Sequence, residues 1–136
     1  MKIVLDTNCL LYAVSNESDY HGILTALQQG RYTLCYSNDI LMEYEEMLLR
    51  FYGKKITEHI LGFIFYSINT LLITPYFQWN LILADPDDNK FVDCALNAGA
   101  DFIVTNDKHF NILKNIDFPK INVIDIEAFK EIWSIF

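Results

Sequence analysis

The sequence predicts an α/β protein with a central parallel sheet, and three observations lead to that class. Short apolar runs bounded by polar residues recur along the chain: KIVLD at 2–6, YTLCY at 32–36, FIVT at 102–105 and NVIDI at 122–126. Segments with helical signals separate these runs. No internal repeat or low-complexity segment interrupts the alternation. Buried strands that alternate with helices favour a three-layer α/β/α sandwich around a parallel sheet of four to five strands.

The expected helices are placed by a capping residue and by glycines that end them. Ser37 is an N-cap residue type, and Gly30, Gly53 and Gly99 stand where three helices should stop. A short strand or turn should follow the third helix. The expected helices cover residues 18–29, 38–51, 57–71, 85–98, 108–115 and 127–133.

Length and composition indicate one globular domain that spans residues 1–136. Hydrophobic residues make up 52% of the chain and charged residues 21%, which is typical of a folded protein and not of a disordered one. The opening, KIVLD, resembles a strand, so we expect no secretory signal there. The odd set of cysteines (Cys9, Cys35 and Cys94) contains no CxxC pair. We therefore expect reduced thiols and a cytoplasmic protein.

The charge of the chain limits its partners. The formal net charge is −8, so a polyanion is repelled at long range and broad non-specific nucleic-acid binding is disfavoured. The same charge suits a protein whose acids are neutralised by metal cations or by a basic partner.

The segment from Ile60 to Ala84 contains no charged residue and is long enough to cross a bilayer. Pro75 and the polar residues after it, Gln78 and Asn80, divide the segment into two pieces. We therefore interpret it as a heavily buried hairpin of a globular domain, with a helix ending near Leu71, and not as a membrane span.

Three carboxylates lie within the motif DPDD at residues 85–88. Asp85 fits an N-cap, and Pro86 fits the first helical position, where its missing N–H costs nothing. Steps of three and four from Asp88 reach only apolar residues, so Asp88 should point toward the sheet. Capping and dipole compensation explain Asp85 and Asp87, whereas the inward direction of Asp88 also suits a functional carboxylate.

Three further acids, Glu43, Asp6 and Asp107, carry similar signals. Glu43 lies on the apolar stripe of its helix, where a carboxylate needs either a functional site or a buried ion pair. Asp6 ends the first expected strand and Asp107 follows the FIVT strand, and open α/β sheets bind ligands at such strand ends. Singly, each could be a turn or cap residue. We expect these three acids and Asp88 to converge at one edge of the sheet.

The motif VLDTN at 4–8, the core-facing Glu43 and the segment DPDDNKFVDCALNAGADFIVTNDKHF at 85–110 resemble the PIN-domain family, in particular its bacterial toxin–antitoxin branch of VapC-like ribonucleases. The resemblance covers nearly the whole chain. It implies a PIN-like α/β/α fold and a Mg²⁺- or Mn²⁺-dependent endoribonuclease. The catalytic, metal-binding carboxylates of the family correspond to Asp6, Glu43, Asp88 and Asp107, with Asp85 as the second choice.

The resemblance also implies supporting residues and partners. Asn8 corresponds to a polar residue that orients the first aspartate, and Ser37 to a hydroxyl residue ahead of the glutamate. The role of Asn106 stays open. Lys108 and His109, next to Asp107, are candidates for contact with the backbone of an RNA substrate. The family further implies a cognate antitoxin protein.

Carboxylates suit such chemistry because oxygen ligands hold Mg²⁺ or Mn²⁺. The three histidines, His21, His59 and His109, share no helical spacing, so the sequence does not indicate a zinc site. One or two bound cations would offset the mutual repulsion of the acids, attract phosphate oxygens and activate water for attack on phosphorus.

Two apolar surfaces indicate contacts with another protein chain. The helix at 60–68 is apolar nearly all round and the tail at 131–136 carries large apolar groups, so we expect a homodimer or an antitoxin contact there.

A non-catalytic PIN-like interaction module stays open as an alternative to the ribonuclease. A metal-dependent phosphatase is the other alternative, although haloacid-type phosphatases need an aspartate where this chain has Asn8.

Overall fold

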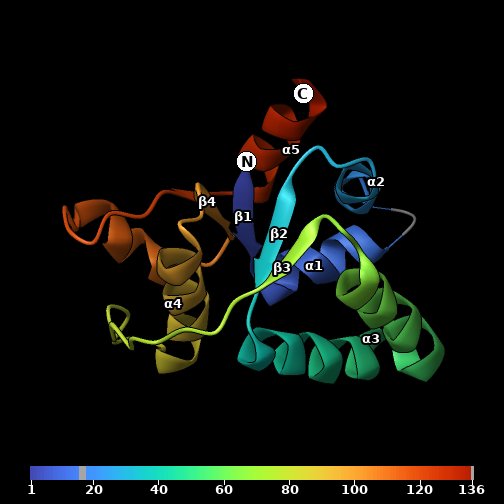
Figure 1. Ribbon diagram of the computed structural model, residues 1–136, viewed down its shortest axis with the longest axis horizontal. Helices are drawn as coiled ribbons and strands as arrows, with labels where there is room; N and C mark the ends of the chain where they lie inside the picture. The colour runs from blue at the N-terminus through green and yellow to red at the C-terminus, as the bar shows by residue number, and fades with distance from the viewer. Residues whose placement is uncertain (16–17, 136) are drawn as a thin grey trace.

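The computed structural model describes residues 1–15 and 18–135, and its strands and helices alternate along the chain (Figure 1). The strands are β1 (Lys2–Leu5), β2 (Thr33–Tyr36), β3 (Thr70–Leu72), β4 (Phe102–Val104) and β5 (Val123–Ile124). The α-helices are α1 (Thr7–Val14), α2 (Gly22–Gln28), α3 (Asn38–Tyr66), α4 (Asn89–Ala98) and α5 (Ile126–Ile135). Two 3-10 helices are η1 (Pro86–Asp88) and η2 (Lys108–Asn115).

The five strands form one parallel sheet in the order β3-β2-β1-β4-β5. In the centre, Ile3 of β1 pairs with Leu34 of β2 on one side and with Phe102 of β4 on the other. The chain therefore builds the sheet outward from β1 in one direction and then returns to place β4 on the opposite side. The carboxyl ends of β1 and β4 form a topological switch point, which is where open α/β sheets bind ligands.

Helices cover both faces of the sheet, which confirms the predicted α/β/α class. α4 packs across β1, β2 and β4, while α1, α2 and α5 lie on the other side of these strands (Figure 1). Ile3, Val4 and Leu5 are at most 1% exposed. Burial of such side chains contributes roughly 1.5–3 kcal/mol each, so β1 is a rigid base for the residue that follows it.

Several helices begin at a capping residue or end at a glycine where the sequence predicts. Ser37 Oγ accepts a hydrogen bond from Ile40 N (3.3 Å) at the start of α3. α3 kinks at Gly53, whose φ of 80° lies in the left-handed region that glycine adopts without strain. The segment expected as a helix at 85–98 consists of η1 followed by α4, and α4 ends at Gly99, as predicted.

The predicted helices miss α1 altogether. Its eight residues, TNCLLYAV, follow Asp6 directly, and the side chain of Asp6 makes no capping hydrogen bond. Cys9, Leu10 and Ala13 form a buried stripe on α1, and the helix packs against α3. Tertiary packing therefore stabilises a helix that is too short and too weakly capped to be read from sequence.

The third predicted helix is too long at its C-terminal end. It was expected to run to Leu71, but α3 ends at Tyr66, and Thr70–Leu72 form the edge strand β3. Pairing with β2 satisfies the backbone of these residues; Leu34 N donates to Asn69 O (3.0 Å) and Ile73 N to Tyr36 O (2.7 Å). The first predicted helix, at 18–29, is correspondingly shorter, since α2 covers Gly22–Gln28.

The prediction of a buried hairpin within residues 60–84 is wrong. Residues 76–82, here called the clamped segment, run without regular secondary structure along α4. Side chains one turn apart on α4 hold its backbone. Asn89 exchanges two hydrogen bonds with Ile82 (2.9 and 2.8 Å), Asp93 accepts one from Trp79 N (3.0 Å), and Asn97 accepts one from Tyr76 N (3.3 Å). Among the described residues, no helix combines the length and the apolar character that crossing a bilayer requires.

Candidate functional site

Asp6 occupies the carboxyl end of β1, at the switch point of the sheet. Its side chain is buried, and its Oδ2 accepts a hydrogen bond from Thr105 Oγ1 (2.7 Å), which follows β4 directly. Burial raises the pKa of the Asp6 carboxyl; hydrogen bonds from Thr105 and from the Thr7 backbone lower it, and the charges of Asp107 and Glu43 raise it further. The Thr105 hydroxyl therefore holds Asp6 in one orientation beside other acids.

Asp88 ends η1 and points into the interior, as its helical spacing predicts. The residue is only 8% exposed, and within residues 1–15 and 18–135 its Oδ2 atom has no hydrogen-bond partner. Burial raises the pKa of Asp88 to about 7, and the charges of Asp107, Asp85 and Asp6 add to the rise. A buried carboxylate oxygen without a partner is costly, so this atom is available for a cation.

Asp107 approaches the same point from the end of β4. Its backbone N–H donates to Thr105 Oγ1 (3.0 Å), and its Oδ1 accepts a hydrogen bond from His109 N (2.9 Å), so that Asp107 also caps η2. Thr105 thus contacts both Asp6 and Asp107. One hydroxyl fixes the relative positions of two of the predicted acids.

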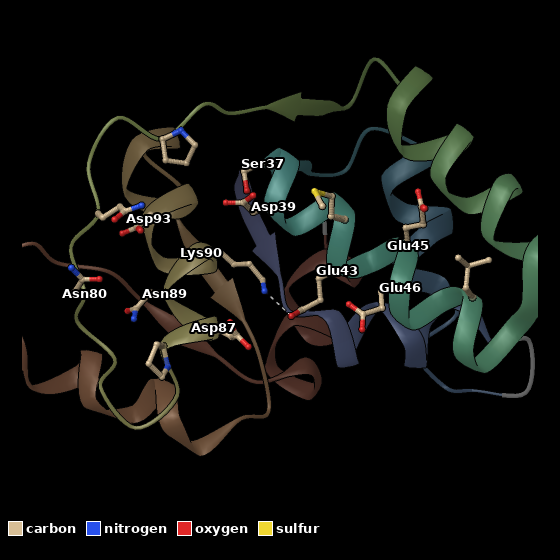
Figure 2. Close-up of a pocket in the computed structure, with 15 residues that line it drawn as sticks. Ser37, Asp39, Glu43, Glu45, Glu46, Asn80, Asp87, Asn89, Lys90 and Asp93 are labelled. Carbon is tan, nitrogen blue, oxygen red and sulfur yellow. Dashed lines mark ion pairs between the residues drawn. The ribbon is translucent and has the colours of Figure 1, made fainter.

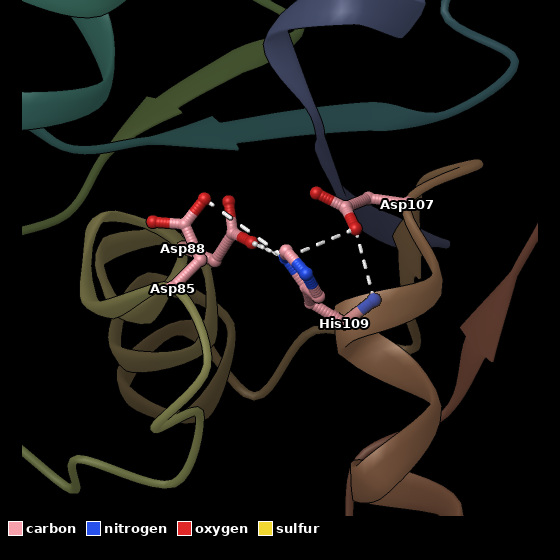
Figure 3. Close-up of side chains that lie close together, drawn as sticks. All are labelled: Asp85, Asp88, Asp107 and His109. Carbon is pink, nitrogen blue, oxygen red and sulfur yellow. Dashed lines mark hydrogen bonds and ion pairs between the residues drawn. The ribbon is translucent and has the colours of Figure 1, made fainter.

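A second aspartate and a histidine join Asp88 and Asp107. Each of the four residues Asp85, Asp88, Asp107 and His109 offers a ligand atom, and these atoms lie within 4.8 Å of one another (Figure 3). His109 Nδ1 is 3.4 Å from Asp107 Oδ1, 3.6 Å from Asp88 Oδ2 and 3.9 Å from Asp85 Oδ2. Asp85, the second choice in the sequence, lies beside Asp88, and His109 lies among the acids. We call these four residues the aspartate–histidine cluster.

Glu43 differs from the other three predicted acids because its partner is a lysine. Its Oε1 lies 2.7 Å from Nζ of Lys90, a residue of α4, and its Oε2 accepts a hydrogen bond from Thr7 Oγ1. The ion pair that the sequence left open for Glu43 is therefore present. Glu43 still belongs to the same neighbourhood, since its charge raises the pKa of Asp6.

An open, acidic groove of about 880 Å³ lies beside this ion pair, between α3 and α4 (Figure 2). The clamped segment contributes Gln78 and Asn80 to its wall. Lys90 is the one basic residue among the groove-lining residues of the described chain. The acidic residues on the walls include Asp39, Glu43, Glu45, Glu46 and Asp93.

The supporting residues expected from sequence lie in different surroundings. Asn8 is exposed, and among described residues no hydrogen bond joins it to Asp6; Thr105 makes that contact. Ser37 caps α3. Asn106 caps α5, because its Oδ1 accepts from Ile126 N (3.1 Å). Lys108 is exposed at the start of η2.

Sequence reasoning missed Thr105, Thr7 and Lys90. Thr105 carried a usable signal, since it is the first polar residue after an apolar strand and stands two positions before Asp107. Thr7 carried a similar one beside Asp6. Lys90 carried none, because its contact with Glu43 depends on how α3 and α4 pack.

An α/β/α fold with acids gathered at the switch point is typical of α/β proteins that bind a ligand at the carboxyl ends of their strands. Comparison with known proteins specifies the family. A family model described as "PIN domain" matches residues 2–109. The chain belongs to the PIN domain family.

Solved structures of similar fold agree with this assignment. One is VapBC2 from Rickettsia felis bound to a DNA fragment from its promoter, with a TM-score of 0.63, 19% identity, and coverage of 92% of this chain and 98% of that chain. Another is DNA-bound VapBC from Salmonella typhimurium, with a TM-score of 0.63, 20% identity, and coverage of 93% and 98%. No curated protein matches the chain.

Proposed function

We propose that this protein is a Mg²⁺- or Mn²⁺-dependent endoribonuclease that hydrolyses phosphodiester bonds of RNA. Asp6, Asp88 and Asp107 are the proposed metal-binding acids, and Glu43 is the fourth acid of the site. One observation carries the proposal: acids from β1, η1 and the end of β4 meet at the switch point, and buried Asp88 Oδ2 lacks a hydrogen-bond partner among the described residues.

The residues fit a hard divalent cation. Two carboxylates about 5 Å apart repel each other by roughly 3 kcal/mol at an effective dielectric constant of about 20. Oxygen ligands of this kind hold Mg²⁺ and Mn²⁺. When bound, such a cation supplies positive charge for the phosphate and lowers the pKa of a water molecule that attacks phosphorus.

The side chains of the protein divide the remaining tasks. Thr105 holds the carboxylate of Asp6 and the backbone N–H of Asp107, and His109 N donates to the Asp107 carboxylate, so these acids are positioned before substrate arrives. Glu43, neutralised by Lys90 and hydrogen-bonded to Thr7, acts on Asp6 through its charge and its position. The exposed Lys108 lies next to Asp107, where it can meet a phosphate of the RNA backbone.

The test is cleavage of labelled total RNA in the presence of Mg²⁺, of Mn²⁺ and of EDTA. We expect cleavage with either metal and none with EDTA. Asp6→Asn should abolish cleavage with little change in the circular dichroism spectrum, and the matched variant Asp87→Asn, at an exposed position, should retain most of it. Cleavage that survives in EDTA, or in a nuclease-free preparation of Asp6→Asn, would refute the assignment.

We further propose that the protein is the toxin of a toxin–antitoxin pair. Support comes from the fold, which it shares with proteins solved as VapBC complexes, and from the acidic groove, which suits a basic segment of an antitoxin. Expression in a bacterial host should then arrest growth, and Asp6→Asn should relieve the arrest. Equal growth inhibition by both proteins would show that RNA cleavage is not the cause.

A further inference from the structure

We propose that His109 binds, through Nδ1, the divalent cation that we assign above to Asp88 and Asp107, that Asp85 beside them can bind it as well, and that the nitrogen ligand makes the centre prefer Mn²⁺ to Mg²⁺. The proposal rests on the proposed function for the presence of a cation. It assigns to His109 a role different from the contact with RNA that the sequence suggests.

The first support is the position of the imidazole ring. His109 Nδ1 lies between three carboxylates, at 3.4 Å from Asp107 Oδ1, 3.6 Å from Asp88 Oδ2 and 3.9 Å from Asp85 Oδ2 (Figure 3). Each of these separations exceeds 3.2 Å or so, the usual limit of a nitrogen–oxygen hydrogen bond. The nitrogen therefore faces the same point as the carboxylate oxygens without being tightly bonded to any one of them.

The second support is independent of the ring. Asp88 is 8% exposed, and its Oδ2 has no hydrogen-bond partner within residues 1–15 and 18–135. This oxygen is the one that faces His109 Nδ1. A buried acceptor that faces other carboxylate oxygens favours the binding of a positively charged ligand among them.

The third support is the rigidity of the element that carries His109. The backbone N–H of His109 donates to Asp107 Oδ1 (2.9 Å), which fixes the start of η2. The next residue, Phe110, is fully buried, and its ring packs edge-on against Phe91 of α4, with centroids 6.3 Å apart. This contact joins η2, which carries His109, to α4, which follows Asp88 directly.

Ligand chemistry gives the direction of the metal preference. Mg²⁺ selects oxygen ligands and retains much of its hydration, whereas imidazole is a good ligand for transition metals and their affinity rises across the series that begins with Mn²⁺. Replacing one oxygen ligand by an imidazole nitrogen therefore favours Mn²⁺ relative to Mg²⁺. The competing explanation is that His109 is only a counter-ion for the acids in the metal-free protein.

Calorimetric titration of the metal-free protein with MnCl₂ and with MgCl₂, in the absence of RNA, separates the two explanations. The variant is His109→Gln, and His59→Gln, at an exposed position on α3, is the matched control. We expect His109→Gln to lower Mn²⁺ affinity by at least the roughly tenfold that loss of a supporting partner of a metal ligand costs. Mg²⁺ affinity should change less, and His59→Gln should bind both metals as the wild type does. Unchanged or tighter Mn²⁺ binding by His109→Gln would support the counter-ion and overturn the proposal.

Electron spin-echo spectroscopy of the wild-type protein with bound Mn²⁺ provides a readout that does not depend on a folded variant. We expect nitrogen modulation of the Mn²⁺ signal, and a change in that modulation when the histidines carry ¹⁵N. Absence of nitrogen coupling in the loaded wild type would overturn the proposal. Nitrogen coupling without any RNA cleavage would leave this inference standing and remove the proposed function, whereas cleavage without coupling would do the reverse.

Discussion

The aspartate–histidine cluster and the Glu43–Lys90 pair place acids on the two flanks of Asp6 and treat them in opposite ways. Glu43 is compensated within the protein, by a lysine at 2.7 Å and by the Thr7 hydroxyl. Asp88 is more buried, yet in the described chain its Oδ2 has no hydrogen-bond partner, and its nearest basic group is a histidine. Both residues are acids on core-facing stripes of helices. The difference teaches that burial alone does not single out a functional acid, and it is the burial of Asp88 without a hydrogen-bond partner for Oδ2 among the described residues that supports the proposed metal site.

Substitution of Asp88 should have the largest effect on RNA cleavage. Asp88→Asn should reduce RNA cleavage on the order of 100-fold or more, because it removes an acid from the proposed metal centre. In EDTA the same variant should melt a few degrees higher than the wild type, since the neutral amide is not repelled by Asp85, Asp107 and Asp6. Mn²⁺ should stabilise it less than the wild type.

Asp87→Asn is the matched control for this comparison, because Asp87 is exposed and adjacent in sequence. It should cleave RNA nearly as well as the wild type and respond equally to metal. If Mn²⁺ raised the melting temperatures of Asp88→Asn and the wild type by the same amount, Asp88 would not belong to a metal site.

Removal of Lys90, the partner of Glu43, should lower the stability of the protein, which is the opposite of the effect expected for Asp88→Asn in EDTA. Lys90→Met leaves Glu43 partly buried without a counter-charge, so the protein should lose on the order of 1–2 kcal/mol of unfolding free energy, less than a fully buried pair loses. Lys54→Met, which removes an exposed pair with Glu58, should leave the melting temperature unchanged. Equal melting of both variants would show that the Glu43–Lys90 pair is a surface contact only.

The two sides should also differ in their response to pH. The pKa of Asp88 is about 7 in the folded state against an ordinary 3.8, so between these values the folded protein binds more protons than the unfolded chain. The contribution of Asp88 to stability is therefore full below about pH 4 and is lost as pH rises through about 7. Urea unfolding in EDTA from pH 5 to 8 should show a decline that is shallower in Asp88→Asn.

The smallest effect concerns assembly. The C-terminal end of α3 leaves Phe65, Tyr66 and Ile68 exposed, at 57%, 82% and 96%, whereas Trp133 of α5 packs against the core. Of the two predicted surfaces, we therefore expect the C-terminal end of α3 to form the homodimer contact. Light scattering at micromolar concentration should give twice the monomer mass, and Tyr66→Ser should lower it without changing RNA cleavage.

The sequence was sufficient to predict features that depend on local periodicity or on strand ends. Asp88 was placed by helical spacing, Asp6 and Asp107 by their positions after apolar runs, and the sheet by alternation of strands and helices. The partner of Glu43 could not be predicted, because Lys90 lies on a different helix and reaches Glu43 only through packing. The position of the His109 ring was equally inaccessible, since it depends on the tight turn of η2 that Asp107 caps.

The clamped segment links the wall of the groove to the chemistry. Asn89, the residue after Asp88, exchanges two hydrogen bonds with Ile82, and Asp93 and Asn97 continue the attachment along α4. α4 therefore both binds the clamped segment and supports the buried Asp88. We therefore expect that a molecule displacing the wall of the groove would also shift the start of α4, and with it the carboxylate of Asp88.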